Sequence, residues 1–189
     1  MGTSVNQRSP DTPPWILAQD AYTDASMPVN QALREVWRAA SNETETNLMS
    51  FLVQPELTAF ADLAARISTP SEAFQETSRF ISDQKVASLV ADIARRAVIQ
   101  SAGVENPRQQ FLQRLFAEAT NYLVSRDLPG HIRPGGKIET VSDARRFTQA
   151  MMDTTADAVR RTPEPPVIAR DTWPTYVRSV VQTIRRRQE

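Results

Sequence analysis

The sequence contains no cysteine and only one histidine among its 189 residues. Without cysteine, the chain can form no disulfide, perform no thiolate chemistry and build no cysteine-based metal site. A single histidine leaves carboxylates as the remaining metal ligands. The acidic residues are scattered and do not pair along an apolar helix face, as a di-metal carboxylate bundle would require. We therefore expect neither a metal nor a cofactor.

Long apolar stretches are also missing. No run of about 18 apolar residues occurs, so the sequence predicts no membrane span and no membrane partner. The first fourteen residues, MGTSVNQRSPDTPP, lack the basic start and apolar stretch of a signal peptide. From these features we expect a cytoplasmic protein, and we expect its source to be bacterial or phage.

Glycine is scarce, with 5 residues, whereas the 13 prolines lie mostly between segments that have helical periodicity. This distribution is typical of helices joined by short connectors. Apolar residues recur at helical spacing in seven segments, and no segment alternates like a strand. The segments begin near residues 29, 55, 69, 82, 106, 140 and 173. We predict an all-α, single-domain bundle of about seven helices over residues 15–189, with a flexible arm over residues 1–14 and an alternative boundary near residue 103.

Several residues predict how these helices begin, end and pack. Capping boxes are expected at Thr69 and Asn106, a helix should start at residues 140–143, and Gly103 should follow the end of a helix over 82–102. The helix that begins near residue 106 has the broadest apolar face, so we place it at the centre of the core. Its apolar face consists of Phe111, Leu112, Leu115, Phe116, Ala119, Tyr122 and Leu123, and the other segments add Leu48, Leu52, Phe60, Phe74 and Phe147. Trp15, Trp37 and Trp173 fit either interface anchors or core positions, and we expect Trp37 in the core. Met151 and Met152 fit either the core or a soft pocket.

The charges are unevenly distributed although the net charge is zero. Residues 1–105 carry 13 acidic and 8 basic residues, and residues 106–189 carry 9 and 14. Such an asymmetry indicates either a polyanionic partner or two halves that face one another. Arginine accounts for 20 of the 22 basic residues. This excess is explained either by a GC-rich genome or by the planar fork with which arginine binds phosphate and carboxylate.

The stretch RDLPGHIRPGGK, residues 126–137, holds three of the five glycines and the only histidine. It is not a phosphate-binding P-loop, because Lys137 stands one position late and Ile138 replaces the serine or threonine that would hold magnesium. The residues before it form a helix rather than a strand. Since Pro-Gly pairs favour turns, we expect the stretch to end one helix and connect it to the next.

Within this stretch, Arg126 and His131 form the pattern R-x4-H. The pattern resembles the R-x4-6-H signature of the HEPN ribonucleases, which are helical bundles. The resemblance covers six residues. It implies a metal-independent ribonuclease in which Arg126 and His131 act together on the scissile phosphate, usually across a dimer. Histidine can transfer a proton and arginine can stabilise the charge that develops on phosphate.

The basic C-terminal half contains the residues that we predict to bind an anion or a nucleic-acid backbone. They are Arg133, Lys137, Arg145, Arg146, Arg178, Arg185 and Arg186. No aromatic residues lie among them, so base stacking is not expected. We expect a non-enzymatic subunit or adaptor that binds a protein partner or a second copy of itself, and alternatively a nucleic-acid backbone. The second hypothesis is the HEPN-like ribonuclease, and the third is a regulator that holds a small ligand in the bundle.

Overall fold

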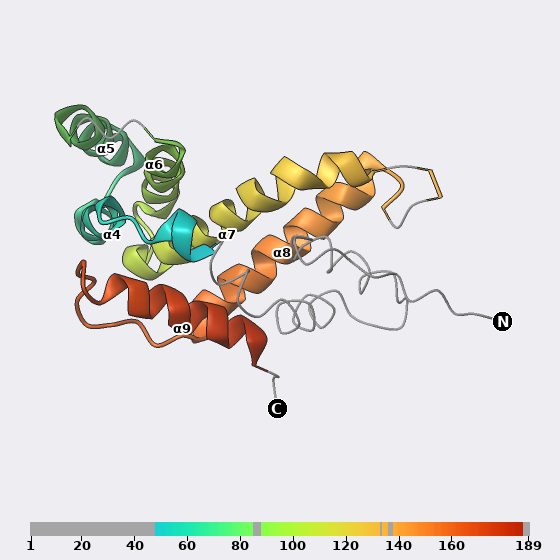
Figure 1. The fold of residues 1–189 in the computed structure, drawn as a ribbon. Helices are drawn as coiled ribbons and strands as arrows, with labels where there is room; N and C mark the ends of the chain where they lie inside the picture. Colours follow the sequence, from blue (N-terminus) through green and yellow to red (C-terminus); the bar gives the residue numbers. More distant parts are fainter. Residues whose placement is uncertain (1–47, 85–87, 133, 136–137, 187–189) are drawn as a thin grey trace.

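The computed structural model describes residues 48–84, 88–132, 134–135 and 138–186 (Figure 1). These residues form an all-α bundle, as predicted, and their one β feature is an isolated bridge between Ile132 and Ile138. The arm predicted over residues 1–14 and the helix predicted near residue 29 lie outside the described residues. None of the described helices is long and apolar enough to cross a membrane.

The helices follow one another through short connectors. Residues 48–52 are helical and lead into the other elements. These are α4 (Glu56–Arg66), α5 (Pro70–Gln84), α6 (Leu89–Ser101), α7 (Pro107–Asp127), the 3-10 helix η1 (Leu128–His131), α8 (Val141–Arg161) and α9 (Trp173–Arg185). In Figure 1, α7 and α8 lie side by side as a long hairpin. Helices α4, α5 and α6 gather near the start of α7, and α9 packs on α8.

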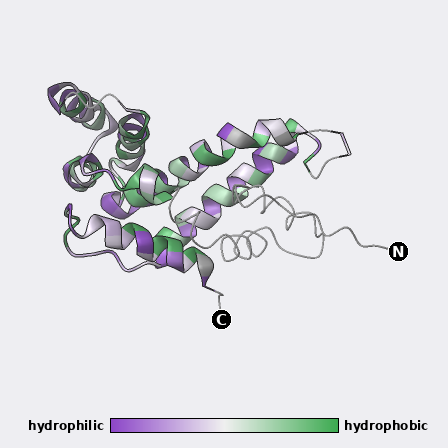
Figure 2. Cartoon of the chain, in the orientation of Figure 1, coloured by the Kyte–Doolittle hydropathy of each residue, from purple (hydrophilic) through white to green (hydrophobic). Residues whose placement is uncertain are grey.

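Helix α7 is the centre of the bundle, as its broad apolar face predicts. It contacts α4, α6 and α8. Its buried side chains are Phe111, Leu112, Leu115, Phe116, Ala119, Leu123 and Val124. In the first half of α7, Phe111, Leu112, Leu115 and Phe116 are buried because other helices pack against them. Each helix carries both hydrophobic and hydrophilic residues (Figure 2), as amphipathic helices do.

An aromatic cluster joins α7 to α9 in the core. The rings of Phe116 and Trp173 meet edge to face with centroids 6.1 Å apart, and Tyr176 packs against both. The indole Nε1 of Trp173 donates a hydrogen bond of 2.6 Å to the carbonyl oxygen of Leu52. Burial of the predicted apolar run that contains Leu48 and Leu52 is confirmed. The cluster therefore connects the beginning of the described chain to its last helix.

Two of the helix ends lie where the sequence predicts them, the start of α8 and the end of α6. At α8, the hydroxyl of Thr140 accepts a hydrogen bond from the Asp143 amide, and the Asp143 carboxylate accepts one from the Thr140 amide. Gly103 follows α6 with φ +78°, a conformation that favours glycine. A Cβ atom there would also lie 3.0 Å from the carbonyl oxygen of Ser68. Both features fix where α6 ends and α8 begins.

Three local predictions are wrong. The helix expected from Ser82 begins instead at Leu89, because Ser88 caps it by accepting a hydrogen bond from the Ala91 amide. Phe74, predicted to be in the core, is 55% exposed, with the guanidinium of Arg95 5.8 Å from its ring centroid. Asn106 forms no side-chain cap.

The box at Thr69 forms with a shift. Its hydroxyl accepts from the Glu72 amide, but the Glu72 carboxylate accepts from the amide of Ser68 rather than from that of Thr69.

Candidate functional site

The seam between α7 and α8 is closed over one half of the hairpin. Near its middle, the hydroxyl groups of Thr120 and Thr155 lie 3.1 Å apart and are buried. Each hydroxyl also hydrogen-bonds a backbone carbonyl of its own helix, one turn earlier. Beyond this pair, towards the core, buried side chains such as Phe116 of α7 and Val159 of α8 lie in the bundle.

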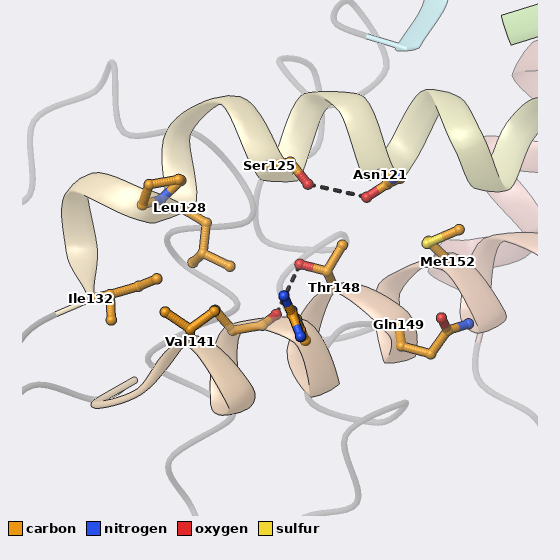
Figure 3. Close-up of a pocket in the computed structure, with 11 residues that line it drawn as sticks. Asn121, Ser125, Leu128, Ile132, Val141, Thr148, Gln149 and Met152 are labelled. Carbon is orange, nitrogen blue, oxygen red and sulfur yellow. Dashed lines mark hydrogen bonds between the residues drawn. The ribbon is translucent and has the colours of Figure 1, made fainter.

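Over the other half, towards the loop, the seam opens into a groove of about 560 Å³. Figure 3 shows the groove with α7 on one side and α8 on the other. Met152 stands at one end, and Ile132 and Val141 stand at the other. The lining residues are Asn121, Ser125, Leu128, Pro129, Ile132, Val141, Ala144, Arg145, Thr148, Gln149 and Met152. From Val141 to Met152 the groove follows α8 for about 16 Å, at 1.5 Å per residue.

The groove has an apolar floor and a small-residue centre. Leu128 and Ala144 are buried at the floor, whereas Val141 is 60% exposed at the open end. Thr148 is half-buried and its hydroxyl donates to the carbonyl oxygen of Ala144. Because the hydroxyl proton is used within α8, Thr148 offers the groove mainly its methyl group. The seam stays open here because Ala144, Thr148 and Ser125 are too short to fill it.

Most polar side chains along the rim already have partners. The Ser125 hydroxyl donates to the amide oxygen of Asn121 (3.0 Å), and Gln149 donates to Asp153 (2.8 Å). Arg145 differs from them, because it is exposed and forms no hydrogen bond or ion pair with any other residue that the structure describes. The rim therefore presents one positive charge that is available to a ligand.

The neighbouring Arg146 is engaged within α8. Its guanidinium pairs with Asp143, whose other oxygen accepts from the amide and hydroxyl of Thr140. The Thr140 hydroxyl, followed by Arg146, holds the pKa of the Asp143 carboxyl below its usual value of 3.8. Arg145 is only two residues from Asp143, so the two side chains leave α8 on different sides and do not pair.

Three residues of the stretch 126–137 form the end wall of the groove. Helix α7 continues directly into η1, so the helical backbone does not stop at Pro129 as a turn-former would suggest. Leu128, Pro129 and Ile132 contribute their side chains to the groove. The predicted connector is therefore also part of the candidate site.

The two residues of the R-x4-H pattern lie on this continuous helical run. Arg126 is exposed in the last turn of α7, and His131 ends η1. The side chain of His131, and both Arg133 and Lys137, lie outside the described residues. The joint action of Arg126 and His131 stays a prediction.

The other predicted basic residues divide into two groups. Arg145 and Arg146 occupy the beginning of α8, whereas Arg178 and Arg186 are exposed on α9 and at its C-cap. Thr162, which follows α8, hydrogen-bonds Thr183 of α9, so the α9 group lies near the opposite end of α8. Arg185 ends α9, and its side chain lies outside the described part. The predicted residues therefore lie at both ends of a helix about 32 Å long.

A second cavity, of about 420 Å³, lies at the beginning of α7. Arg108 and Glu164 line it and form an ion pair with one another, and Arg108 also donates to the carbonyl oxygen of Pro166. Burial, followed by the nearby Glu164 carboxylate, raises the pKa of the Tyr176 phenol far above its usual value. Arg108 and Glu164 neutralise one another's charges, and their ion pair connects α7 to the segment before α9.

In the described part of the chain, no cluster of three or more His, Asp or Glu residues could hold a metal ion.

Most of the groove could not be identified from the sequence. Arg145 was predicted as a binding residue, and Met152 was considered for a pocket. Asn121, Ser125, Thr148 and Gln149 were not identified, because polar residues on a helix are usually solvated. The available signal was the row of short side chains at Ala144 and Thr148, one turn apart.

Comparisons of the chain with protein-family models, with curated proteins and with solved structures find no match.

Proposed function

We propose that this protein is a non-enzymatic subunit or adaptor that binds a protein partner by accepting a helix of that partner in the groove between α7 and α8. The observation that supports this proposal is the groove itself, which combines an apolar floor with polar rims on two long helices. A helix laid into an apolar groove is a recurrent mode of protein recognition. The groove follows α8 for about 16 Å, which equals about three turns of a bound helix.

The exposure of Val141 supports the same proposal. Its side chain is 60% exposed and continues the apolar floor to the outside. Covering it with an apolar residue of a partner would remove that surface from water, at about 25 cal/mol per Å². The short residues in the middle of the groove would allow the partner helix to approach closely, as ridge-into-groove packing requires.

Nucleic-acid binding stays a prediction without a specific observation in its favour. Arg146 pairs with Asp143, and Arg160 and Arg161 both pair with Asp157. Part of the excess of basic residues is therefore used inside α8. The ribonuclease hypothesis also stays a prediction, which cleavage assays of Arg126→Ala and His131→Ala would test.

Site-specific photocrosslinking of the full chain tests the proposed function. A benzophenone amino acid replaces Gln149, which is exposed on the groove rim. The matched control places it at Gln100, which is exposed on α6 and lies outside the groove. We expect a discrete crosslinked protein from position 149 and none from position 100. The crosslinked protein is then purified and its binding to wild type and to Thr148→Trp is measured.

The groove is confirmed as the docking site if the purified partner binds wild type and loses at least about tenfold in affinity for Thr148→Trp, a difference of about 1.4 kcal/mol. Equal crosslinking from both positions, or equal binding to both variants, would contradict it. A crosslink to a second copy of the chain would identify the partner as the protein itself.

A further inference from the structure

The groove also indicates which kind of helix it accepts, an inference that rests on the proposed function. We infer that the partner helix is acidic, and that Arg145 selects it by pairing with a carboxylate near one end of that helix. Arg145 thereby becomes the residue that determines specificity and fixes the direction of the bound helix.

The charge at the open end of the groove is the first support for this inference. Arg145 lines the groove, is exposed and pairs with none of the described residues. The two nearest acidic residues in the sequence do not neutralise it. Asp143 pairs with Arg146 and leaves α8 on a different side from Arg145, and no hydrogen bond or ion pair joins the exposed Glu139 to Arg145. A carboxylate from a partner would therefore meet an arginine whose fork is still available.

The polarity along the groove is the second support. Arg145 lies one turn after the Val141 end, while the Met152 end carries no basic side chain among the lining residues. Among the lining residues, the positive charge therefore lies near one end only. A bound helix therefore gains most when its carboxylate lies at that end, which fixes its direction.

The interior of the groove limits where that carboxylate can lie. Leu128 and Ala144 are buried, and Thr148 uses its hydroxyl inside α8. A charge placed over this floor would lose water without gaining a partner, which is costly. The apolar residues of the partner should therefore face the floor, with the acidic residues at the rim. The occupant is an amphipathic helix with a net negative charge.

A charge-swap binding experiment on the full chain tests the inference. The probes are two synthetic helical peptides, labelled with a fluorophore, with leucines spaced three and four residues apart. One peptide carries glutamates beside its leucines, and the other carries lysines at the same positions. Anisotropy measures the binding of each peptide to wild type, to Arg145→Glu and to Arg96→Glu. Arg96 is exposed on α6, so its variant makes the same change of charge outside the groove.

We expect the glutamate peptide to bind wild type about two- to five-fold more tightly than Arg145→Glu, as for a partly exposed ion pair. The lysine peptide should show the reverse preference, and Arg96→Glu should behave like wild type. Higher salt should reduce both preferences. Equal preferences for wild type and Arg145→Glu would overturn the role of Arg145 and leave the groove as a docking site. Failure of both peptides to bind wild type would overturn the proposed function and the inference together.

A third probe separates an external partner from the chain itself. It is a peptide of residues 27–47, which contains the predicted apolar face with Leu33 and Trp37 and three acidic residues, Glu35, Glu43 and Glu45. Weaker binding of this peptide than of the glutamate peptide would support a separate partner. Tighter binding, lost in Thr148→Trp, would overturn it, because the occupant would then be a segment of this chain or of a second copy.

Discussion

The two ends of the α7–α8 hairpin are built from the same two helices but differ in what covers them. At the near end, α4, α6 and α9 enclose the hairpin, and aromatic side chains such as Phe116 and Trp173 fill the space. At the far end, short side chains such as Ala144 and Thr148 leave a groove. An amphipathic helix can therefore be part of the core over half its length and form the wall of an open groove over the other half.

The largest expected effect breaks the near end. Trp173→Ala removes a fully buried indole and its hydrogen bond to the Leu52 carbonyl oxygen. We expect the free energy of unfolding to fall by about 3–5 kcal/mol, as for other large-to-small changes in a core. Urea denaturation followed by circular dichroism measures it.

The matched change at the far end is Val141→Ala. Because Val141 is 60% exposed, its truncation should change the free energy of unfolding by less than about 0.5 kcal/mol. If Trp173→Ala and Val141→Ala lowered the free energy of unfolding by similar amounts, both ends of the hairpin would belong equally to the core. That result would contradict the difference between the two ends.

A smaller effect is expected at the boundary between the two ends. Thr155→Val removes one hydroxyl of the buried Thr120–Thr155 pair. The remaining Thr120 hydroxyl can still donate to the Phe116 carbonyl oxygen. We therefore expect a loss of about 1 kcal/mol for the single variant and little further loss in Thr120→Val/Thr155→Val. A double-mutant cycle by urea denaturation measures the coupling, and additive losses would show that the two hydroxyls act independently.

The smallest effect concerns the far end alone and depends on pH. The pKa of Asp143 is lowered by Thr140 and Arg146, so its charged form is favoured in the folded state. This contribution is fully present above the usual value of 3.8 and disappears as the pH falls through the lower folded pKa. NMR titration of the carboxyl should show it, and Thr140→Ala should raise the pKa. An unchanged pKa in that variant would show that the cap does not hold Asp143.

The sequence predicted the fold class and the position of α7, because periodic apolar residues report burial directly. It also predicted that α8 starts at Thr140, although not the capping box that Thr140 forms with Asp143. It failed where two local signals competed, as at Ser82 and Ser88, which can both begin a helix.

The groove could be predicted only in part, for a different reason. A groove arises where two helices approach without filling the space, and this depends on which short side chains meet across the seam. Ser125 and Thr148 come from different helices, and no local pattern relates them. Arg145 was predicted from its charge, but its place on the groove rim depends on how α7 and α8 meet.

The length of the hairpin has a mechanical consequence. Helices α7 and α8 have 21 residues each, about 32 Å, and they pack against one another with the buried Thr120–Thr155 contact near the middle. The length of the hairpin would set the distance between a helix bound at the far end and α4, α5 and α6. Inserting one whole turn into both α7 and α8 should therefore move the bound helix outward by about 5.4 Å.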